Sequence, residues 1–252
     1  MLPIERKNRI KDLIVEKKSI TVAELTKQYK VTEETIRRDL KQLEDDGVLT
    51  RTYGGAYISE GVQNDVDINL REYIHVDGKK KIARKCLSFI HNGDSIFLDA
   101  STTSLMIASM IKELKLTVVT NSIKVVNMLK DQPTINLIII GGTFASSSQS
   151  NLGRNAEANM QNYFFDTAFI SCRSVSMDHG ITDSNELQAG VRYVATKQAN
   201  KVFLIADYTK FDKTSFTKIC NFDQINAVIV DDTLSDDWHT FFKELNISLH
   251  EA

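Results

Sequence analysis

The spacing of apolar residues predicts three helices within the first 46 residues. A stripe at helical spacing, which includes Ile4, Ile10 and Ile14, predicts the first helix over residues 3–18. Two shorter helices follow it, each with a capping residue of its own. The chain therefore begins with a small helical domain.

The second and third helices both begin at a threonine. Thr21 and Glu24 fit a capping box ahead of a helix over about residues 22–29, in which each side chain bonds a backbone N–H of the first turn. Thr32 caps the next helix, and Gly47 ends it, since glycine is the usual residue just past a helix. Two short helices joined by a tight turn form a helix-turn-helix.

The third helix has one apolar face and one polar face. Ile36, Leu40 and Leu43 recur at i, i+4 and i+7, so we expect them to face the core. The outer face carries Glu34, Arg37, Arg38 and Lys41. Such a helix can enter the major groove of DNA, where arginine binds guanine or phosphate. Adjacent arginines also commonly do no more than solubilise a helix, and the pattern alone leaves both interpretations open.

A hairpin is predicted directly after this helix. Two short strands flank Gly54-Gly55 within residues 48–58, which is typical of the wing of a winged helix-turn-helix. Arg51 and Tyr53 lie on this wing, where we expect them to contact the DNA backbone or the minor groove.

The larger part of the chain alternates between strand-like and helix-like segments. Residues 59–80 are polar and weakly periodic, and we interpret them as a linker. The apolar strand-like runs are residues 95–100, 116–120, 135–140, 167–172, 201–207 and 227–232. The helix-like segments are residues 103–114, 122–130, 153–164, 185–200 and 236–245. This alternation predicts an α/β domain with a parallel sheet that is covered on both faces.

Small or polar residues follow several of these strands. In a parallel sheet, ligands bind beyond the carboxyl ends of the strands. The hydroxyls of residues 101–104 stand at a helix start, which suits an anion. Asn121, Gly141-Gly142 and Asp207 follow three further strands. Ordinary capping explains each of these singly, but their convergence on one edge predicts a polar small-molecule site.

Composition narrows the function classes. The chain has 252 residues, 25% of them charged, with a net charge of −2. No apolar run approaches the roughly 18 residues that a membrane-spanning helix needs, and the N-terminus is charged, so we expect a cytoplasmic protein. Three separated cysteines and five scattered histidines form no metal-binding spacing. We therefore expect reduced, buried thiols, no metal and no cofactor.

Several short motifs resemble the DeoR family of bacterial transcription regulators. In the first 58 residues they are T-V-A-E-L, V-T-E-E-T-I-R-R-D-L, L-E-D-D-G-V-L-T-R and Y-G-G-A. Further along they are D-A-S-T-T, V-V-T-N-S, I-I-G-G, H-G-I-T-D-S-N-E and L-I-A-D-Y-T-K-F. The resemblance implies a winged helix-turn-helix over residues 1–58 and a sensor domain over residues 81–252. The sensor domain of the family is similar to ribose-5-phosphate-isomerase-like folds.

The resemblance also assigns candidate site residues. On the DNA-reading face and wing they are Thr21, Thr32, Glu34, Thr35, Arg37, Arg38, Lys41, Arg51 and Tyr53. In the effector site they are Asp99, Ser101, Thr102, Thr103, Asn121, Gly141, Gly142, Arg173, Glu186, Arg192, Asp207 and Lys210. By this resemblance Thr102 and Thr103 hold a phosphate, Asp99 and Asp207 hold sugar hydroxyls, and Lys210 pairs with the anion.

This sequence departs from the family pattern at four places. Tyr53 stands where histidine is common, Ser101 replaces a glycine, and Arg192 stands about where lysine is common. Cys172-Arg173-Ser174 replaces a small stretch that contains glycine, and we hypothesise that Arg173 narrows the range of effectors.

Two functions from different classes follow. The first is a repressor of carbohydrate-metabolism genes, a homodimer or homotetramer that binds double-stranded operator DNA under the control of a phosphorylated sugar. The second is a sugar-phosphate isomerase with an accessory DNA-binding domain. The first is favoured because the motifs cover the whole chain and nothing marks Glu186 or Asp207 as a reactive base.

Overall fold

A computed structural model describes residues 2–17, 19–46, 48–52, 54–57, 68–72 and 75–252. The chain forms two compact units, residues 1–76 and 77–252. Part of the predicted linker is helical, because α4 (Ile68–Arg71) lies within it and α5 (Val76–Leu87) begins there. The helix that opens the second unit thus begins before residue 81, where the sensor domain was predicted to start.

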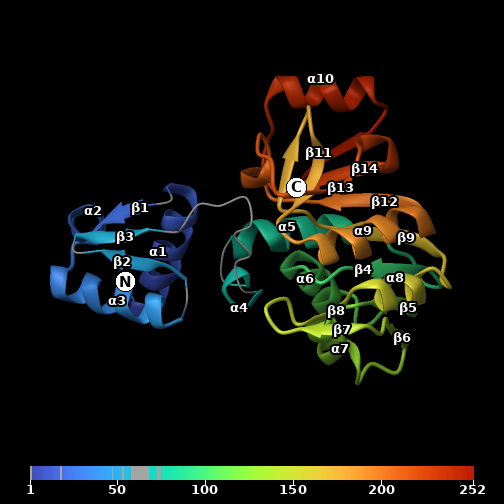
Figure 1. Ribbon diagram of the computed structural model, residues 1–252, viewed down its shortest axis with the longest axis horizontal. Coiled ribbons are helices and arrows are strands. Elements are labelled where there is room, and N and C mark those ends of the chain that lie inside the picture. Colours follow the sequence, from blue (N-terminus) through green and yellow to red (C-terminus); the bar gives the residue numbers. More distant parts are fainter. Residues whose placement is uncertain (1, 18, 47, 53, 58–67, 73–74) are drawn as a thin grey trace. The chain divides into compact units, whose positions relative to one another are not determined.

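The N-terminal unit is a winged helix-turn-helix (Figure 1). Its elements are α1 (Pro3–Lys17), β1 (Ser19–Thr21), α2 (Val22–Tyr29), α3 (Glu33–Asp45), β2 (Thr50–Thr52) and β3 (Gly55–Tyr57). The strands form an antiparallel sheet in the order β1-β3-β2. The three helices and the hairpin are as predicted. Strand β1 was not predicted, because three residues are too few to show a period.

The predicted N-terminal caps and the core of this unit are confirmed, with one exception in the core. Gly47, which was predicted to end the third helix, lies outside the described residues. Thr21 and Glu24 form the capping box, and Thr32 caps α3. The inward-facing residues Ile36, Leu40 and Leu43 are fully buried. Ile4 was wrongly placed in the apolar stripe of α1, since its side chain is 66% exposed. It lies six residues, about 1.7 turns, before Ile10 and so points away from the buried face.

A buried ion pair joins α1 to α3. Arg6 Nε lies 2.6 Å from Asp39 Oδ2, and both side chains are 5% exposed. The two helices are also joined at the surface, where Lys7 Nζ donates to Gln42 Oε1 at 2.8 Å. Asp39 lies on α3 among the residues of its buried face, so the pair fixes how this helix is held.

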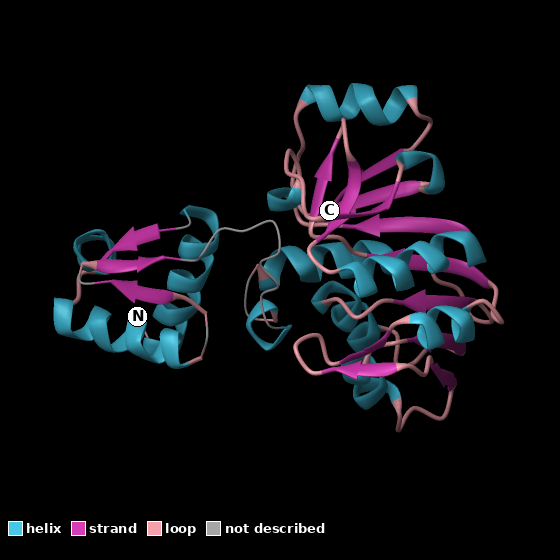
Figure 2. Cartoon of the chain, in the orientation of Figure 1, coloured by secondary structure: helices cyan, strands magenta, loops and turns pink. Residues whose placement is uncertain are grey.

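The second unit is built on a seven-stranded parallel sheet (Figure 2). The strand order is β15-β14-β12-β9-β4-β5-β6, and every neighbouring pair is parallel. The strands are β4 (Ser95–Leu98), β5 (Leu116–Thr120), β6 (Ile135–Ile139), β9 (Phe165–Ile170), β12 (Ala199–Ile205), β14 (Ala227–Val230) and β15 (Ser248–Glu251). The six predicted strands are all present. The edge strand β15 was not predicted.

Helices cover both faces of this sheet. On one face α5, α6 (Thr102–Met110) and α7 (Ile123–Leu129) pack against residues such as Ile96 and Leu98. On the other face α8 (Arg154–Met160), α9 (Glu186–Gln198) and α10 (Asp236–Glu244) pack against Phe97 and its neighbours. Successive residues of β4 thus enter opposite cores, as the period of a strand requires. The predicted three-layer α/β domain is confirmed.

Two small antiparallel sheets were not predicted. One is the hairpin of β7 (Thr143–Ala145) and β8 (Ser150–Leu152). The other has the order β10-β11-β13, formed by β10 (Ser174–Ser176), β11 (Gly180–Asp183) and β13 (Thr217–Cys220). All five strands have only three or four residues, and several of these are polar, so they show no apolar run.

Replacing Asp39 with asparagine should lower the stability of the N-terminal unit by about 3 kcal/mol, because it leaves the buried Arg6 charge without its counter-ion. Urea unfolding of the full chain separates the two units. Far-UV circular dichroism follows both units, whereas fluorescence of Trp238, the only tryptophan, follows the second unit alone. We expect the transition seen by circular dichroism to begin at a lower urea concentration, and the transition seen by fluorescence to keep its midpoint.

Lys7→Ala is the matched control, because it removes the exposed bond between the same two helices. Its effect should stay within about 0.5 kcal/mol. An equal loss of unfolding free energy in both variants would mean that the buried Arg6–Asp39 pair stabilises this unit no more than an exposed hydrogen bond does.

Candidate functional site

The polar face of α3 is exposed. Glu34, Arg37, Arg38 and Lys41 all lie on the surface, as predicted. At the start of the helix, the hydroxyl oxygens of Thr32 and Thr35 lie 2.9 Å apart in a hydrogen bond. This face combines three positive charges with hydroxyls at a helix N-terminus, which are groups that bind DNA phosphates and base edges.

Arg37 is held only loosely in the unbound chain. Its Nη2 donates to Glu33 Oε2 at 2.9 Å, and the two side chains are 59% and 58% exposed. Exposed pairs of this spacing contribute about 0.5 kcal/mol or less. The guanidinium can therefore leave Glu33 for a DNA phosphate at little cost.

Arg51, on β2, is bound to Glu44 of α3. Its backbone N–H and Nε donate to the two carboxylate oxygens of Glu44, at 2.9 and 2.6 Å. These bonds lower the pKa of Glu44 and join β2 to α3. Thr21 is likewise engaged, since its hydroxyl belongs to the capping box. Tyr53 lies outside the described residues.

The sheet of the second unit places a polar site where its strand order reverses. Counted along the chain, the first three strands run outward from β4 to one edge, and the other four run outward from β9 to the opposite edge. Ligands bind beyond the carboxyl ends of strands at such a point. Asp99 follows β4, Ser171 follows β9, and the Ser171 N–H donates to Asp99 Oδ2 at 2.8 Å. This bond ties the two halves of the sheet together.

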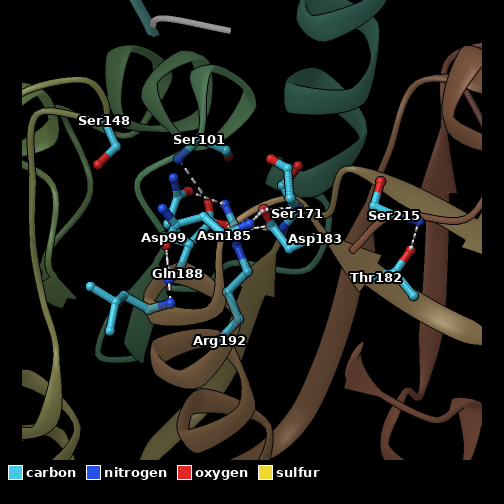
Figure 3. Close-up of polar contacts among 12 residues, drawn as sticks. Asp99, Ser101, Ser148, Ser171, Thr182, Asp183, Asn185, Gln188, Arg192 and Ser215 are labelled. Carbon is cyan, nitrogen blue, oxygen red and sulfur yellow. Dashed lines mark hydrogen bonds and ion pairs between the residues drawn. The ribbon is translucent and has the colours of Figure 1, made fainter. Parts of the chain in front are cut away.

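Asp99 is fully occupied by the chain itself (Figure 3). Its Oδ1 accepts from the Ser101 N–H at 3.1 Å and the Ser104 hydroxyl at 2.7 Å. Its Oδ2 accepts from Ser171 and from Arg192 Nε at 2.7 Å. A carboxylate has about four lone-pair positions. All four are taken within the chain, which favours a positioning role for Asp99, and its expected role as a sugar-hydroxyl acceptor stays a prediction.

Arg192 joins two aspartates beneath this edge, and we call Asp99, Asp183, Gln188 and Arg192 the Arg192 cluster. Besides Asp99, the guanidinium contacts Asp183 Oδ2 through Nη1 and Gln188 Oε1 through Nη2 at 3.3 Å. Arg192 is only 3% exposed. The family resemblance predicts Arg192 and Glu186 as effector contacts. Of the two acids in the stretch T-D-S-N-E, however, Asp183 at the end of β11 is buried, whereas Glu186 is exposed.

Asp99 and Arg192 are each held in the charged form. Burial alone raises the pKa of Asp99, but the charge of Arg192 and the hydrogen bonds that Asp99 accepts outweigh it, so the pKa lies below its ordinary value. Burial likewise opposes the charge of Arg192, yet the carboxylates of Asp183 and Asp99 outweigh it and raise the pKa of the guanidinium.

The start of α6 offers groups for an anion. Ser101 caps the helix, and its hydroxyl accepts from the Ser104 N–H at 3.0 Å. Thr102 and Thr103, the first two residues of α6, are 7% and 2% exposed. The first N–H groups of a helix have no intrahelical acceptor, and the helix dipole favours negative charge there. Ser101 itself thus serves the helix rather than a ligand.

Asn121, at the end of β5, presents an acceptor that is not used. Its Nδ2 donates to the carbonyl of Asn151 at 3.1 Å. Its Oδ1 is buried and accepts no hydrogen bond from the described residues. A buried unsatisfied acceptor costs about 1–3 kcal/mol, so this oxygen is a natural partner for a ligand hydroxyl.

The double glycine after β6 lets the neighbouring backbone come close. Gly142 has a φ of 140°, and a Cβ there would lie 2.7 Å from the Leu152 carbonyl oxygen. Gly141 is exposed, and its N–H donates to Asn159 Oδ1 at 3.1 Å. Both glycines therefore serve the packing of the β7–β8 hairpin and α8.

Lys210 lies beside the β9 end, on the 3₁₀ turn η1 (Tyr208–Lys210). Its Nζ donates to the Ser171 hydroxyl at 3.0 Å and lies 3.9 Å from Asp207 Oδ2. Asp207, which is 6% exposed, accepts from the Thr209 hydroxyl. Within the described residues, no hydrogen bond joins the side chain of Arg173 or Glu186 to these groups. Arg173 is half-buried, and Glu186 is exposed at the first turn of α9.

The other chemistry of the described residues is limited. No group of three His, Cys, Asp or Glu side chains among them is placed to hold a metal ion. None of the described helices is long and apolar enough to cross a membrane. The three cysteines are buried and unpaired, as predicted, and burial raises the pKa of Cys172 to about 12.

Comparison with protein families matches both units. Residues 6–61 match the DeoR-like helix-turn-helix domain, and residues 74–232 match the DeoR C-terminal sensor domain. The chain belongs to the DeoR family. It is a DNA-binding transcription regulator with a sensor domain, and the predicted resemblance is confirmed.

Curated relatives agree over nearly their whole length. An uncharacterised HTH-type regulator of Bacillus subtilis, YulB, is 35% identical, over 93% of this chain and 91% of the relative. The HTH-type transcriptional repressor GlcR of the same species is 32% identical, over 90% and 88%. The putative aga operon transcriptional repressor of Escherichia coli O157:H7 is 30% identical, over 92% and 88%.

Solved structures resemble this DeoR-family chain more distantly. Ribose 5-phosphate isomerase A from Methanocaldococcus jannaschii is 17% identical and covers 54% of each chain, with a TM-score of 0.39. This likeness is too distant to carry an argument.

Replacing Asp99 with asparagine should lower the stability of the sensor unit at pH 7 by about 3 kcal/mol, because it removes one counter-ion of the buried Arg192. Since the folded chain lowers the pKa of Asp99, its stabilisation is complete above the unfolded pKa and is lost as the pH falls through the folded pKa. The difference between wild type and variant should therefore narrow below about pH 4.

Urea unfolding followed by Trp238 fluorescence measures this difference from pH 7 to pH 3. Asp178→Asn, at an exposed position of the same unit, is the control and should leave the free energy of unfolding nearly unchanged. A difference for Asp99→Asn that stayed constant with pH would contradict an ionised, ion-paired Asp99.

Proposed function

We propose that this regulator represses carbohydrate-metabolism genes and that a phosphorylated sugar or related metabolite controls its binding to operator DNA. The observation that carries the proposal is that one chain has two such surfaces. The first is the exposed basic face of α3. The second is a polar sheet edge with the start of α6, Lys210 and the Asn121 Oδ1, which accepts no hydrogen bond from the described residues. Relatives support it, since two are named as repressors, one of them of the aga operon.

On the DNA side, α3 would enter the major groove. Arg37, Arg38 and Lys41 would neutralise phosphates or bind guanine, and the hydroxyls at the helix start would donate to a phosphate. Arg51 would hold α3 in position through its bond to Glu44 rather than contact DNA directly. Because phosphate contacts release counter-ions, affinity would fall steeply with salt.

On the effector side, a phosphate would bind at the start of α6, with Thr102, Thr103 and Lys210 as donors. The sugar hydroxyls would reach Asn121 Oδ1 and Asp207. The Arg192 cluster would hold Asp99 and Ser171 in place without touching the effector. Arg173 stays a candidate for limiting the effector range.

The effector would act by preferring one arrangement of the regulator over another. Helix-turn-helix proteins read two half-sites as symmetric dimers, so we infer a homodimer or homotetramer. Light scattering of the purified protein measures its mass directly.

Arg38→Ala should weaken binding to duplexes that the full-length protein selects from a random-sequence pool. The loss should be about 1–3 kcal/mol, and Arg37→Ala should behave similarly. Gel shifts at several salt concentrations separate the roles, because losing a phosphate contact also lowers the salt slope by about one. Lys243→Ala, an exposed charge on α10, is the control. Equal DNA binding by Arg37→Ala, Arg38→Ala and the control would contradict the proposal that α3 contacts the DNA.

Lys210→Met should abolish or weaken the response to phosphates by about tenfold or more, because it removes a charge-assisted bond. The gel shift is repeated with ribose 5-phosphate, glucose 6-phosphate and glycerol 3-phosphate, each beside its unphosphorylated parent. Lys213→Met is the matched control, since Lys213 is exposed and its side chain bonds only the Thr209 carbonyl in the described structure. Turnover of ribose 5-phosphate in the same samples would instead favour the isomerase alternative.

A further inference from the structure

Asp231 lies at the end of β14, outside the proposed effector site, and connects two distant segments of the sensor unit. It is 6% exposed. Its Oδ1 accepts from the Tyr208 N–H at 2.9 Å. Its Oδ2 lies against Gly78, where an added Cβ would come within 2.0 Å of it. Its backbone carbonyl accepts from Lys81 Nζ at 3.2 Å.

The first of these segments is η1, which carries Lys210. The turn is closed by the Lys210 N–H, which donates to the Asp207 carbonyl at 3.1 Å. Tyr208 is therefore one of the two residues that lie between Asp207 and Lys210, which contact each other. Any shift of Lys210 that moves this turn also moves the Tyr208 N–H, which donates its hydrogen bond to Asp231.

The second segment is the first turn of α5. Gly78 is the third residue of this helix, and a carboxylate is favoured at a helix N-terminus. Further along, Ile82, Ala83 and Cys86 are fully buried, so the body of α5 is fixed in the core. Its first turn begins at Val76, which is also the last residue of the DNA-binding unit.

We propose that Asp231 transmits effector binding to the start of α5, and through it to the segment that leads to the DNA-binding unit. An effector phosphate would compete with Asp207 for the Lys210 ammonium, which lies 3.9 Å from Asp207 Oδ2 in this structure. The turn η1 would shift, and Asp231 would shift with it against Gly78. This inference rests on the proposed function, because it assumes that a phosphate binds at Lys210.

Two substitutions interrupt the connection without touching the proposed DNA or effector contacts. Gly78→Ala forces the Asp231 carboxylate away from α5, since the new Cβ would overlap Oδ2. Asp231→Asn keeps the size of the side chain but removes its charge at the helix start. Asp232→Asn is the matched control, because Asp232 is the next residue, is exposed, and bonds only its neighbour Thr233 in the described structure.

The full-length variants are compared by gel shift on the selected duplexes, with and without each of the three phosphates, and by Trp238 fluorescence for folding. Calorimetry measures the affinity for the phosphates. In the wild type we expect a phosphate to change the DNA dissociation constant by about 5- to 150-fold, the range typical of allosteric coupling. In Gly78→Ala and Asp231→Asn this ratio should fall close to one, while the affinities for DNA alone and for phosphate alone persist.

Hydrogen exchange of the wild type provides a test without substitutions. The phosphate that changes DNA binding should change the protection of the amides over residues 76–80. Suppose that a phosphate changes the DNA binding of the wild type and of both variants equally, and that the amides of residues 76–80 keep their protection. This result would overturn the role of Asp231 but not the proposed function. A wild type whose DNA binding responds to none of the phosphates would overturn the proposed function, and this inference with it.

Discussion

A buried guanidinium shared by two carboxylates organises the carboxyl edge of the sheet. Arg192 binds Asp99 at the end of β4 and Asp183 at the end of β11, and Asp99 in turn binds Ser171 at the end of β9. Removing Arg192 would leave two buried carboxylates without compensation, and removing either aspartate would take from Arg192 one of its two counter-ions. The positions of Ser171, Lys210 and the start of α6 therefore all depend on this one cluster.

The DNA-binding unit uses the same device on a smaller scale. Arg6 and Asp39 form a buried pair that holds α3 against α1, while the opposite face of α3 carries exposed charges. The arginines of this unit thus have different roles. Arg37, on the exposed face of α3, is held only by a weak surface pair with Glu33, whereas Arg6 of α1, the buried partner of Asp39, fixes the position of α3.

At the carboxyl edge of the sheet in the sensor unit, some polar residues hold the site in place and others remain open to a ligand. Asp99, Ser101 and Arg192 are taken up by bonds within the chain. Asn121 Oδ1 accepts no bond from the described residues, and Lys210 keeps only a hydroxyl and a distant carboxylate. A ligand would therefore meet a rigid frame with a few open groups, the arrangement expected of a preorganised site.

The sequence by itself determined the helix-turn-helix, the wing and six of the seven parallel strands, because apolar period, caps and glycine turns are local signals. It also marked the strand ends that carry Asp99, Asn121 and Asp207. Only the tertiary structure decided what those side chains do. Whether Arg192 meets a ligand or Asp183 depends on contacts between residues distant in the chain, and these contacts also brought together the short polar strands β10, β11 and β13. Ion pairing and burial are properties of the packed chain, so no local pattern records them.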